Sequence, residues 1–461
     1  MGLLRTKPLA KLLGDTQVEG HRLRRALGVW DLTAIGIGCI IGVGIFVLPG
    51  VEAAKHAGPG IILSFAVAAA ACACSALCYA ELAAMIPVSG SAYTYGYATL
   101  GEIFAWVIGW DLVLEYMVGA SLVAIGWSAY LQNLLKGMGL ALPHAISAAP
   151  FGKNPGVLDL PAALIVLVLC ALLVRGIKES SRFNLWVVII KVVVILAFIL
   201  LTVWYVKPAN WRPFAPFGWG GIMTAAAIVF LAYLGFDAVS TTAEEAVNPQ
   251  RDLPIGIMVS LFVATALYMA VAAIMTGIVP YTELGVANPI ALVLSTLHMG
   301  WASVLISLGA IAGITSVLLV LLMGQPRILF AMSRDGLLPP FLCRVHGRFQ
   351  TPHLSTWITG AIVATSAALT PIGIVAELCS IGTLFAFMIV CAGVIVLRYT
   401  RPEVHRPFRA PLTPVLPGIG ILLCGTLMAS LPFHTWMRFV VWLCLGLLIY
   451  GLYGYRRSLL N

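Results

Sequence analysis

Twelve hydrophobic stretches, each long enough to cross a lipid bilayer, set what this chain can fold into. Crossing ~30 Å of hydrocarbon takes about 20 helical residues at ~1.5 Å per residue. A backbone in hydrocarbon must satisfy its own polar groups, and an α-helix does so within a single segment. The sequence therefore predicts an all-α membrane protein with 12 transmembrane helices. The expected spans are residues 30–53, 60–86, 100–134, 158–175, 184–206, 220–243, 255–279, 301–326, 354–371, 374–397, 412–432 and 437–455.

The composition agrees with a membrane protein. Of the 461 residues, 61% are hydrophobic and 10% are charged, whereas soluble domains carry roughly 25% charged residues. So few charges cannot cover a water-soluble surface, so most side chains must face lipid or other helices. Residues 1–28 hold six basic side chains and no long apolar core, which predicts a cytosolic head before the first span rather than a cleaved signal peptide.

The distribution of the basic residues predicts the orientation. If the N-terminus lies inside, 20 of the 27 Lys and Arg residues fall on the cytosolic side, six fall outside, and Lys191 lies within a span. Cytosolic loops of membrane proteins carry such an excess. We therefore expect both termini in the cytosol of a multi-pass protein of the cell membrane. The same distribution explains the net charge of +9 without a nucleic-acid partner.

Two of the expected spans contain helix breakers at corresponding places. Gly42 and Gly44 interrupt the first span, and Gly235 interrupts the sixth. Spans 1 and 6 occupy equivalent positions if spans 1–5 and 6–10 form two inverted halves. A pair of breaks at equivalent positions points to a substrate site at the membrane midplane. Small residues also serve helix packing, and for Gly36 and Gly38 we favour that interpretation.

The expected spans and the two inverted halves divide the chain into four segments. They are a cytosolic head (1–28), a first inverted half with spans 1–5 (29–207), a second half with spans 6–10 (208–400), and spans 11–12 with the cytosolic C-terminus (401–461).

Several motifs around the breaks resemble a known superfamily. The stretch 40–46 (IIGVGIF) resembles the G-x-G-[IV]-F signature in span 1 of permeases of the amino acid–polyamine–organocation superfamily. The stretch 230–237 (FLAYLGFD) resembles the span 6 break of its cationic amino acid transporter branch. Loop motifs of the family follow in the right order at 87–96 (PVSGSAYTYG), 244–254 (EEAVNPQRDLP) and 333–339 (SRDGLLP). The resemblance covers residues 20–455 and is to bacterial members.

The resemblance implies a leucine-transporter-like 5+5 inverted repeat with discontinuous helices 1 and 6. It also implies that main-chain amides of the first break hold a substrate carboxylate. The free N–H groups and the positive dipole end of a helix N-terminus favour such an anion. Free carbonyls of both breaks are implied to accept bonds from the α-ammonium. Val43 stands where some relatives have Ser, which removes a hydroxyl contact but leaves the amide. The expected substrate-binding residues are Ile40, Ile41, Gly42, Val43, Gly44, Ile45, Phe230, Leu231, Ala232, Leu234 and Asp237.

Charged residues within spans are costly and are functional candidates by default. Lys191 lies in span 5, where proton-coupled relatives place a lysine at the position of the sodium ion of other members. It could instead snorkel to the interface. Glu115 could pair with Lys191 or a substrate cation, or make a structural interhelical bond. We expect Lys191 and Glu115 to serve proton coupling, whereas Asp237 could also cap the second half of span 6.

Other polar and aromatic side chains carry weaker expectations. The hydroxyls of Thr315 and Ser316 could face the ion position, or bond their own helix. Phe230 could cover the substrate or simply pack. The remaining carboxylates near span ends or on uncertain faces are expected mostly to serve packing or the interface. They are Asp31, Glu81, Asp111 and Glu377.

These features together predict a proton-coupled amino-acid transporter that imports cationic or small neutral L-amino acids, such as arginine, lysine or alanine. A sodium-coupled symporter or an exchanger on the same fold is the alternative. The partners expected are substrate, protons and membrane lipids. We expect no enzyme activity, since no catalytic motif is visible, and no cofactor or metal. Residues 136–157 lack cysteine, so we expect no disulfide-linked heavy chain.

Overall fold

The computed structural model describes residues 5–8, 23–42, 44–137, 139–140, 142–150, 155–286, 289–370, 372–429 and 433–458. Helices make up most of these residues, and the described ranges contain no β-strand beyond two isolated bridges. The protein is therefore all-helical, as the sequence predicts.

Seven helical stretches of the described chain are long and apolar enough to cross a membrane, and four shorter apolar helices accompany them. The helices that carry the long stretches are α4 (Ile61–Met85), α6 (Glu102–Gly137), α8 (Ile177–Thr202), α11 (Pro249–Ile278), α13 (Gly300–Arg334), α15 (Ile372–Thr400) and α17 (Phe433–Ile449). The shorter apolar helices are α2 (Val29–Ile40), α7 (Leu160–Arg175), α9 (Gly218–Val229) and α16 (Val415–Ala429). Another helix, α14 (His353–Leu369), occupies the ninth expected range.

Both glycine-containing segments interrupt their helices. The first helix ends at Ile40, and α3 (Gly44–Glu52) begins four residues later. In the second segment, α9 passes into a 3₁₀ turn, η6 (Phe230–Tyr233), and a short helix, α10 (Ala238–Thr241), follows. Gly235 lies between them with φ +111°, a conformation that favours glycine. The two interruptions therefore follow from local backbone chemistry.

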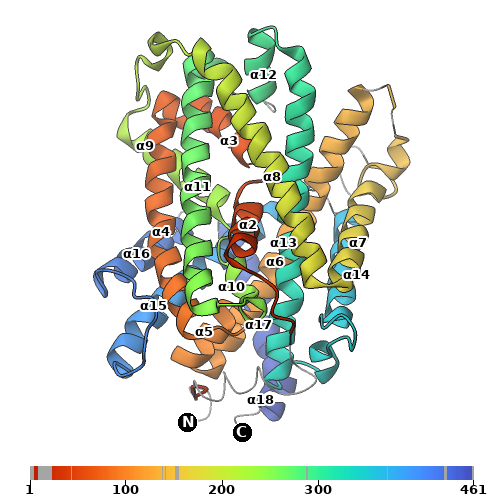
Figure 1. The fold of residues 1–461 in the computed structure, drawn as a ribbon, viewed down its shortest axis with the longest axis vertical. Coiled ribbons are helices and arrows are strands. Elements are labelled where there is room, and N and C mark those ends of the chain that lie inside the picture. Colours follow the sequence, from red (N-terminus) through yellow and green to blue (C-terminus); the bar gives the residue numbers. More distant parts are fainter. Residues whose placement is uncertain are drawn as a thin grey trace.

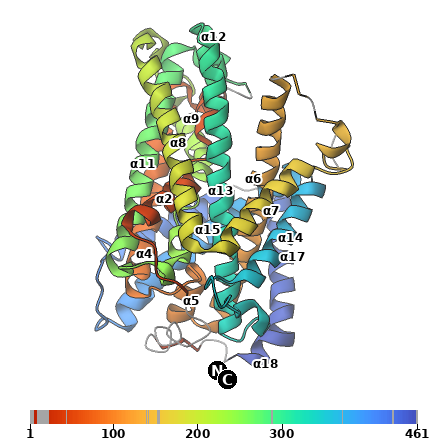
Figure 2. The same cartoon turned by 45° about the vertical axis from the view of Figure 1, so that its right-hand side comes forward.

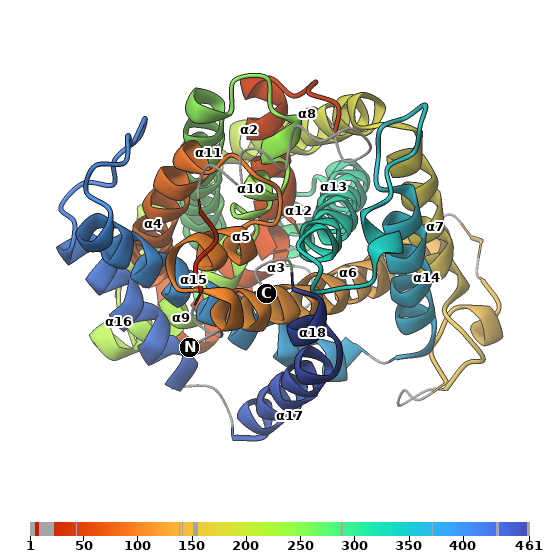
Figure 3. The ribbon, with the colours of Figure 1, turned by 90° about the horizontal axis from the view of Figure 1, so that it is seen from below.

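The interrupted helices lie between long ones. The helix α11 packs against α2 and α4, while α13 packs against α6, α8 and α2 (Figure 1). The pair α7 and α14 packs together on one side of the molecule. Seen from below, α16 and α17 lie at the periphery (Figure 3), and α17 exposes a row of large apolar side chains suited to lipid, among them Met437, Val441 and Leu448. The breaks thus lie in the interior of the bundle.

The two ends of the described chain meet at one end of the bundle, the lower end in Figure 2. The amide of Glu102 at the start of α6 donates to the carbonyl of Arg5 at 3.1 Å. The hydroxyl of Ser458 donates to the Glu102 carboxylate at 2.5 Å. We call this end the terminal end.

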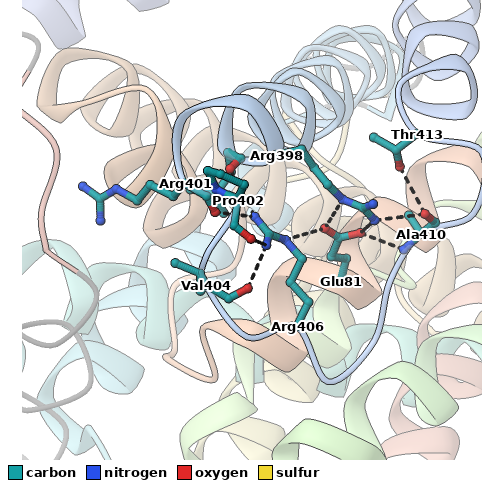
Figure 4. A network of polar contacts seen from close by, with 9 residues as sticks. Glu81, Arg398, Arg401, Pro402, Val404, Arg406, Ala410 and Thr413 are labelled. Carbon is teal, nitrogen blue, oxygen red and sulfur yellow. Dashed lines mark hydrogen bonds and ion pairs between the residues drawn. The ribbon is translucent and has the colours of Figure 1, made fainter.

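At the terminal end, Glu81 of α4 anchors the loop between α15 and α16 (Figure 4). Its carboxylate accepts from Nε and Nη2 of Arg398, at 3.0 and 2.7 Å, and from the amide of Ala410 at 2.7 Å. Nε of Arg406 lies 3.4 Å from Oε1, the oxygen that accepts from Nε of Arg398. A carboxylate so fully engaged serves packing, as the sequence predicts for Glu81.

Candidate functional site

Lys191 and the break after α2 form the centre of the candidate site. The side chain of Lys191 projects from the middle of α8 and is fully buried. Its Nζ atom donates to the carbonyls of Ile37, Gly38 and Ile41, at 3.1, 2.9 and 2.7 Å. The carbonyls of Gly38 and Ile41 can accept these bonds because a helix leaves its last C=O groups without intrahelical partners. The carbonyl of Ile37 also accepts from the amide of Ile41 and offers its second lone pair to Lys191. The ammonium therefore points into the break and does not snorkel to the interface.

A hydroxyl of α13 completes the surroundings of Lys191. Nζ lies 2.6 Å from Oγ of Ser316, whose single hydrogen can go to the carbonyl of Gly38 at 3.0 Å or to that of Gly313 at 2.9 Å. Thr315, the other candidate, turns away. Its hydroxyl bonds Ile311 of its own helix and accepts from Nε1 of Trp127 at 2.9 Å. The structure thus brings Ser316 to Lys191 and leaves Thr315 on another face of α13.

Tyr268 of α11 joins the two breaks. Its hydroxyl lies 2.8 Å from the carbonyl oxygen of Ile40 and 2.9 Å from that of Ala232. One hydroxyl hydrogen can serve only one carbonyl at a time, so Tyr268 can alternate between the first and second break. Tyr268 was not predicted from the sequence. Its position in an apolar span could have indicated a role, because a buried tyrosine hydroxyl needs a hydrogen-bond partner.

Glu115 and Asp237 form a second buried polar group beside the second break. Asp237 is the N-cap residue of α10, but its side chain makes no capping bond and accepts from the Tyr116 hydroxyl at 3.0 Å. Glu115, on the same helix as Tyr116, is close to Asp237 and to the hydroxyl of Thr383. The hydrogen bonds of Lys191 go to main-chain oxygens and Ser316, so its partner in this conformation is not Glu115.

The remaining expected substrate residues gather where the two breaks face each other. Gly44 lies directly against the second break, since a Cβ on it would lie 3.2 Å from Cβ of Ala232. Phe230 is buried, with its ring edge toward Phe387. Val43 lies outside the described residues, as does the side chain of Leu231. Buried within the described part are Ile40, Ile41, Ile45, Phe230, Ala232 and Asp237, while Gly42 and Leu234 are partly buried.

The loop motifs meet at the terminal end, below the breaks. Arg334 of α13 binds Glu244 with both terminal nitrogens, at 3.1 and 2.9 Å. Arg327 binds Glu245 through Nε and Nη2, at 2.6 and 2.8 Å. Burial raises the pKa of Glu245, and the Arg327 guanidinium opposes that shift. These pairs join the loop after the second break to α13 and close this end of the bundle.

The same closed end also includes the first described residues. Lys7 donates to one oxygen of Asp335 at 2.5 Å, and the Tyr93 hydroxyl donates to the other at 2.6 Å. The ion pairs between the motifs at 244–254 and 333–339 were not predicted from the sequence. The signal for them was the presence of opposite charges in two motifs that are both expected on the cytosolic side.

Of the other in-span carboxylates, Asp31 accepts from the amide of Gly28 and the hydroxyl of Ser181, at 3.0 and 2.8 Å, which fits the expected packing role. The side chain of Glu377 lies outside the described part. Asp111 differs from both: it is fully buried, and neither carboxylate oxygen has a hydrogen-bond partner among the described residues.

Known proteins resemble the chain over its whole length. The family model described as amino acid permease matches residues 27–451. The methylthioribose transporter of Bacillus subtilis (strain 168) is 49% identical over 459 residues, covering 100% of this chain and 99% of that protein. The branched-chain amino acid permease BcaP of the same organism is 50% identical over 463 residues, covering 100% and 99%. The vacuolar cationic amino acid transporter 2 of Arabidopsis thaliana is 40% identical over 420 residues, covering 90% of this chain and 66% of that protein.

Proposed function

The chain belongs to the amino acid permease family, and from that premise we propose that it is a proton-coupled amino-acid transporter working by alternating access. It is a multi-pass membrane protein, and its relatives are named as transporters and permeases rather than enzymes. The single observation that carries the proposed coupling is the burial of the Lys191 ammonium against the break after α2.

Lys191 behaves as a cation that the protein itself can charge and discharge. When protonated, it joins α8 to the end of α2 and to Ser316 of α13, with three N–H donors within hydrogen-bonding distance of four oxygens. When deprotonated, it loses the charge that makes these bonds strong. Protonation thus favours the arrangement in which these three helices are joined. A ligand, here the proton, shifts a conformational equilibrium only if it binds the two conformations with different affinity. A sodium ion at this place would need the same oxygens, so the lysine argues for protons and against the sodium-coupled alternative.

The substrate site of the proposal lies between the two breaks. Main-chain amides of the first break, where α3 begins at Gly44, would hold the carboxylate, because helix N-termini favour anions. The carbonyls of both breaks would accept bonds from the α-ammonium. Ile40, Ile41 and Ala232 already accept from Tyr268 or Lys191, and each carbonyl has a second lone pair. The substrate would thereby share carbonyl acceptors with Tyr268 and Lys191.

The side chains of the site favour small or branched neutral amino acids. Ile45, Phe230 and Ala232 are apolar and buried, and the Asp237 carboxylate is engaged by Tyr116. A bacterial relative about 50% identical to this chain is named for branched-chain amino acids. Cationic amino acids are the second candidate, carried by Glu115, whose buried carboxylate lies beside the second break.

The proposal includes a topology of 12 spans, with both termini in the cytosol and inverted halves at 29–207 and 208–400. Its support is that each half opens with an interrupted helix, and that the described chain ends share one end of the bundle. A cysteine introduced at Asn461 should react with an impermeant reagent only after the membrane is opened. Reaction in intact cells would overturn the orientation.

Uptake into liposomes tests the function. Purified protein should concentrate labelled alanine or leucine when the outside is more acidic, in the absence of sodium, and arginine less well. A protonophore should abolish the accumulation. Accumulation that needs sodium, or that needs internal amino acid, would instead support the symporter or exchanger alternative.

A further inference from the structure

Asp111 is a buried acid that the proposed mechanism does not use. It lies on α6, with its side chain fully buried. Its carboxylate packs directly against the main chain of α15, because a Cβ on Gly382 would lie 2.5 Å from Oδ1. Glycine at position 382 is what admits the carboxylate. The fold therefore makes room for this acid at the helix interface.

The charge state of Asp111 follows from these surroundings. Neither oxygen has a hydrogen-bond partner in the described part of the chain. An ionised carboxylate without a partner in a low-dielectric interior is far more costly than the neutral acid. Asp111 therefore carries a proton in this conformation.

The ionisable side chain near Asp111 is Glu115, one helical turn away on the same face. Four residues span about 6 Å along a helix. Several cations of nearby helices are already engaged: Arg327 and Arg334 by glutamates, Arg398 of α15 by Glu81, and Lys191 by the break. Two other titratable groups on elements packed against α6 have hydrogen-bond partners of their own, namely Tyr93 with Asp335 and Asp159 with Ser128. Glu115, which also lies beside Asp237 and the hydroxyl of Thr383, is thus the carboxyl group that shares a helix face with Asp111.

We propose that Asp111 is a second proton-binding site of this transporter, which exchanges a proton with Glu115 as the substrate site opens to the terminal end. This inference rests on the proton coupling proposed above. Release comes first: Asp111 gives its proton to water entering from the terminal end, which leaves a hydrated carboxylate. In the exchange that follows, the O–H bond of Glu115 breaks as the O–H bond of Asp111 re-forms, and the negative charge passes to Glu115. Glu102, at that end of α6, is nine residues or about 14 Å away.

The test compares Asp111→Asn with wild type, with Lys191→Ala and with a control, Asp159→Asn, in liposomes that contain a pH-sensitive dye. Asn is nearly isosteric with the neutral acid but holds no transferable proton. The control makes the same change where Asn can still cap α7. Asp111→Asn should keep its substrate affinity, measured by thermal shift, while substrate-driven proton entry falls at least tenfold. Asp159→Asn should move protons as wild type does.

The outcomes separate the inference from the proposed function. Proton entry in Asp111→Asn equal to wild type, with Lys191→Ala inactive, overturns the role of Asp111 alone. No substrate-driven proton entry in wild type overturns the coupling itself. If Asp111→Asn does not fold, infrared spectra of wild type decide, because the inference requires the carbonyl band of a protonated, water-shielded acid that shifts when substrate binds. A spectrum without that shift overturns it.

Discussion

Nζ of Lys191 lies 2.6 Å from Oγ of Ser316, and both atoms lie within hydrogen-bonding distance of the carbonyl oxygen of Gly38. Three helices, α2, α8 and α13, are therefore joined at one point by an ammonium, a hydroxyl and a main-chain oxygen. Charge-assisted hydrogen bonds are roughly twice as strong as neutral ones. The joint is accordingly tight when Lys191 is charged and weak when it is neutral.

Replacing Lys191 should uncouple transport from protons. We expect Lys191→Ala and Lys191→Gln to lose accumulation driven by a pH gradient, because neither side chain can carry the charge. Lys191→Arg should fail as well, since guanidinium stays protonated and is wider than an ammonium. The measurement is uptake with and without a gradient. Lys178→Ala, on the exposed face of the same helix, is the control. Gradient-driven accumulation by Lys191→Ala would show that the lysine only packs.

Bulk at Gly44 should abolish substrate binding. A Cβ there already approaches Cβ of Ala232 to 3.2 Å, so Gly44→Val should push the two breaks apart and displace the amides that hold the carboxylate. Gly126→Val is the matched control, because nothing lies within 4 Å of its Cβ position. The readout is the stabilisation by alanine or leucine in a thermal-shift assay. A normal substrate-induced shift in Gly44→Val would place the carboxylate elsewhere.

Removing the Tyr268 hydroxyl should weaken the link between the breaks. Tyr268→Phe removes the hydroxyl, so neither the carbonyl of Ile40 nor that of Ala232 can accept a hydrogen bond from residue 268. We expect a loss of about 1 kcal/mol in substrate binding, or roughly fivefold in affinity. Tyr233→Phe is the control, since that hydroxyl bonds Phe65 of α4 instead. Equal effects of the two changes would argue that Tyr268 acts by general stability alone.

Breaking the Glu244–Arg334 pair should open the terminal end. Removing one partner of a buried ion pair costs about 3–5 kcal/mol, so Glu244→Gln should raise the reactivity of a cysteine introduced below the breaks and lower the melting temperature. Glu244→Gln combined with Arg334→Met should recover part of that loss, as a double-mutant cycle would measure. Arg251→Gln, at an exposed position at the start of α11, should have little effect. Additive single effects would contradict the coupling.

The break after α2, and the presence of a charge at Lys191, could be read from the sequence. Hydrophobic length, glycine spacing and the cost of a charge in hydrocarbon are local properties. The choice between Thr315 and Ser316 could not be made, because neighbouring residues on a helix point in directions ~100° apart and the rotation of α13 depends on its packing.

An all-helical membrane protein with interrupted helices follows from the sequence, because these properties depend on residues close together in the chain. Which distant groups meet depends on the tertiary structure. Lys191 reaches carbonyls about 150 positions earlier and a hydroxyl 125 positions later, and Tyr268 reaches Ile40 across 228 positions. Contacts at such separations depend on the packing of whole helices, which no local pattern encodes. Asp111 shows the same limit, since its burial against Gly382 depends on the approach of α15 to α6.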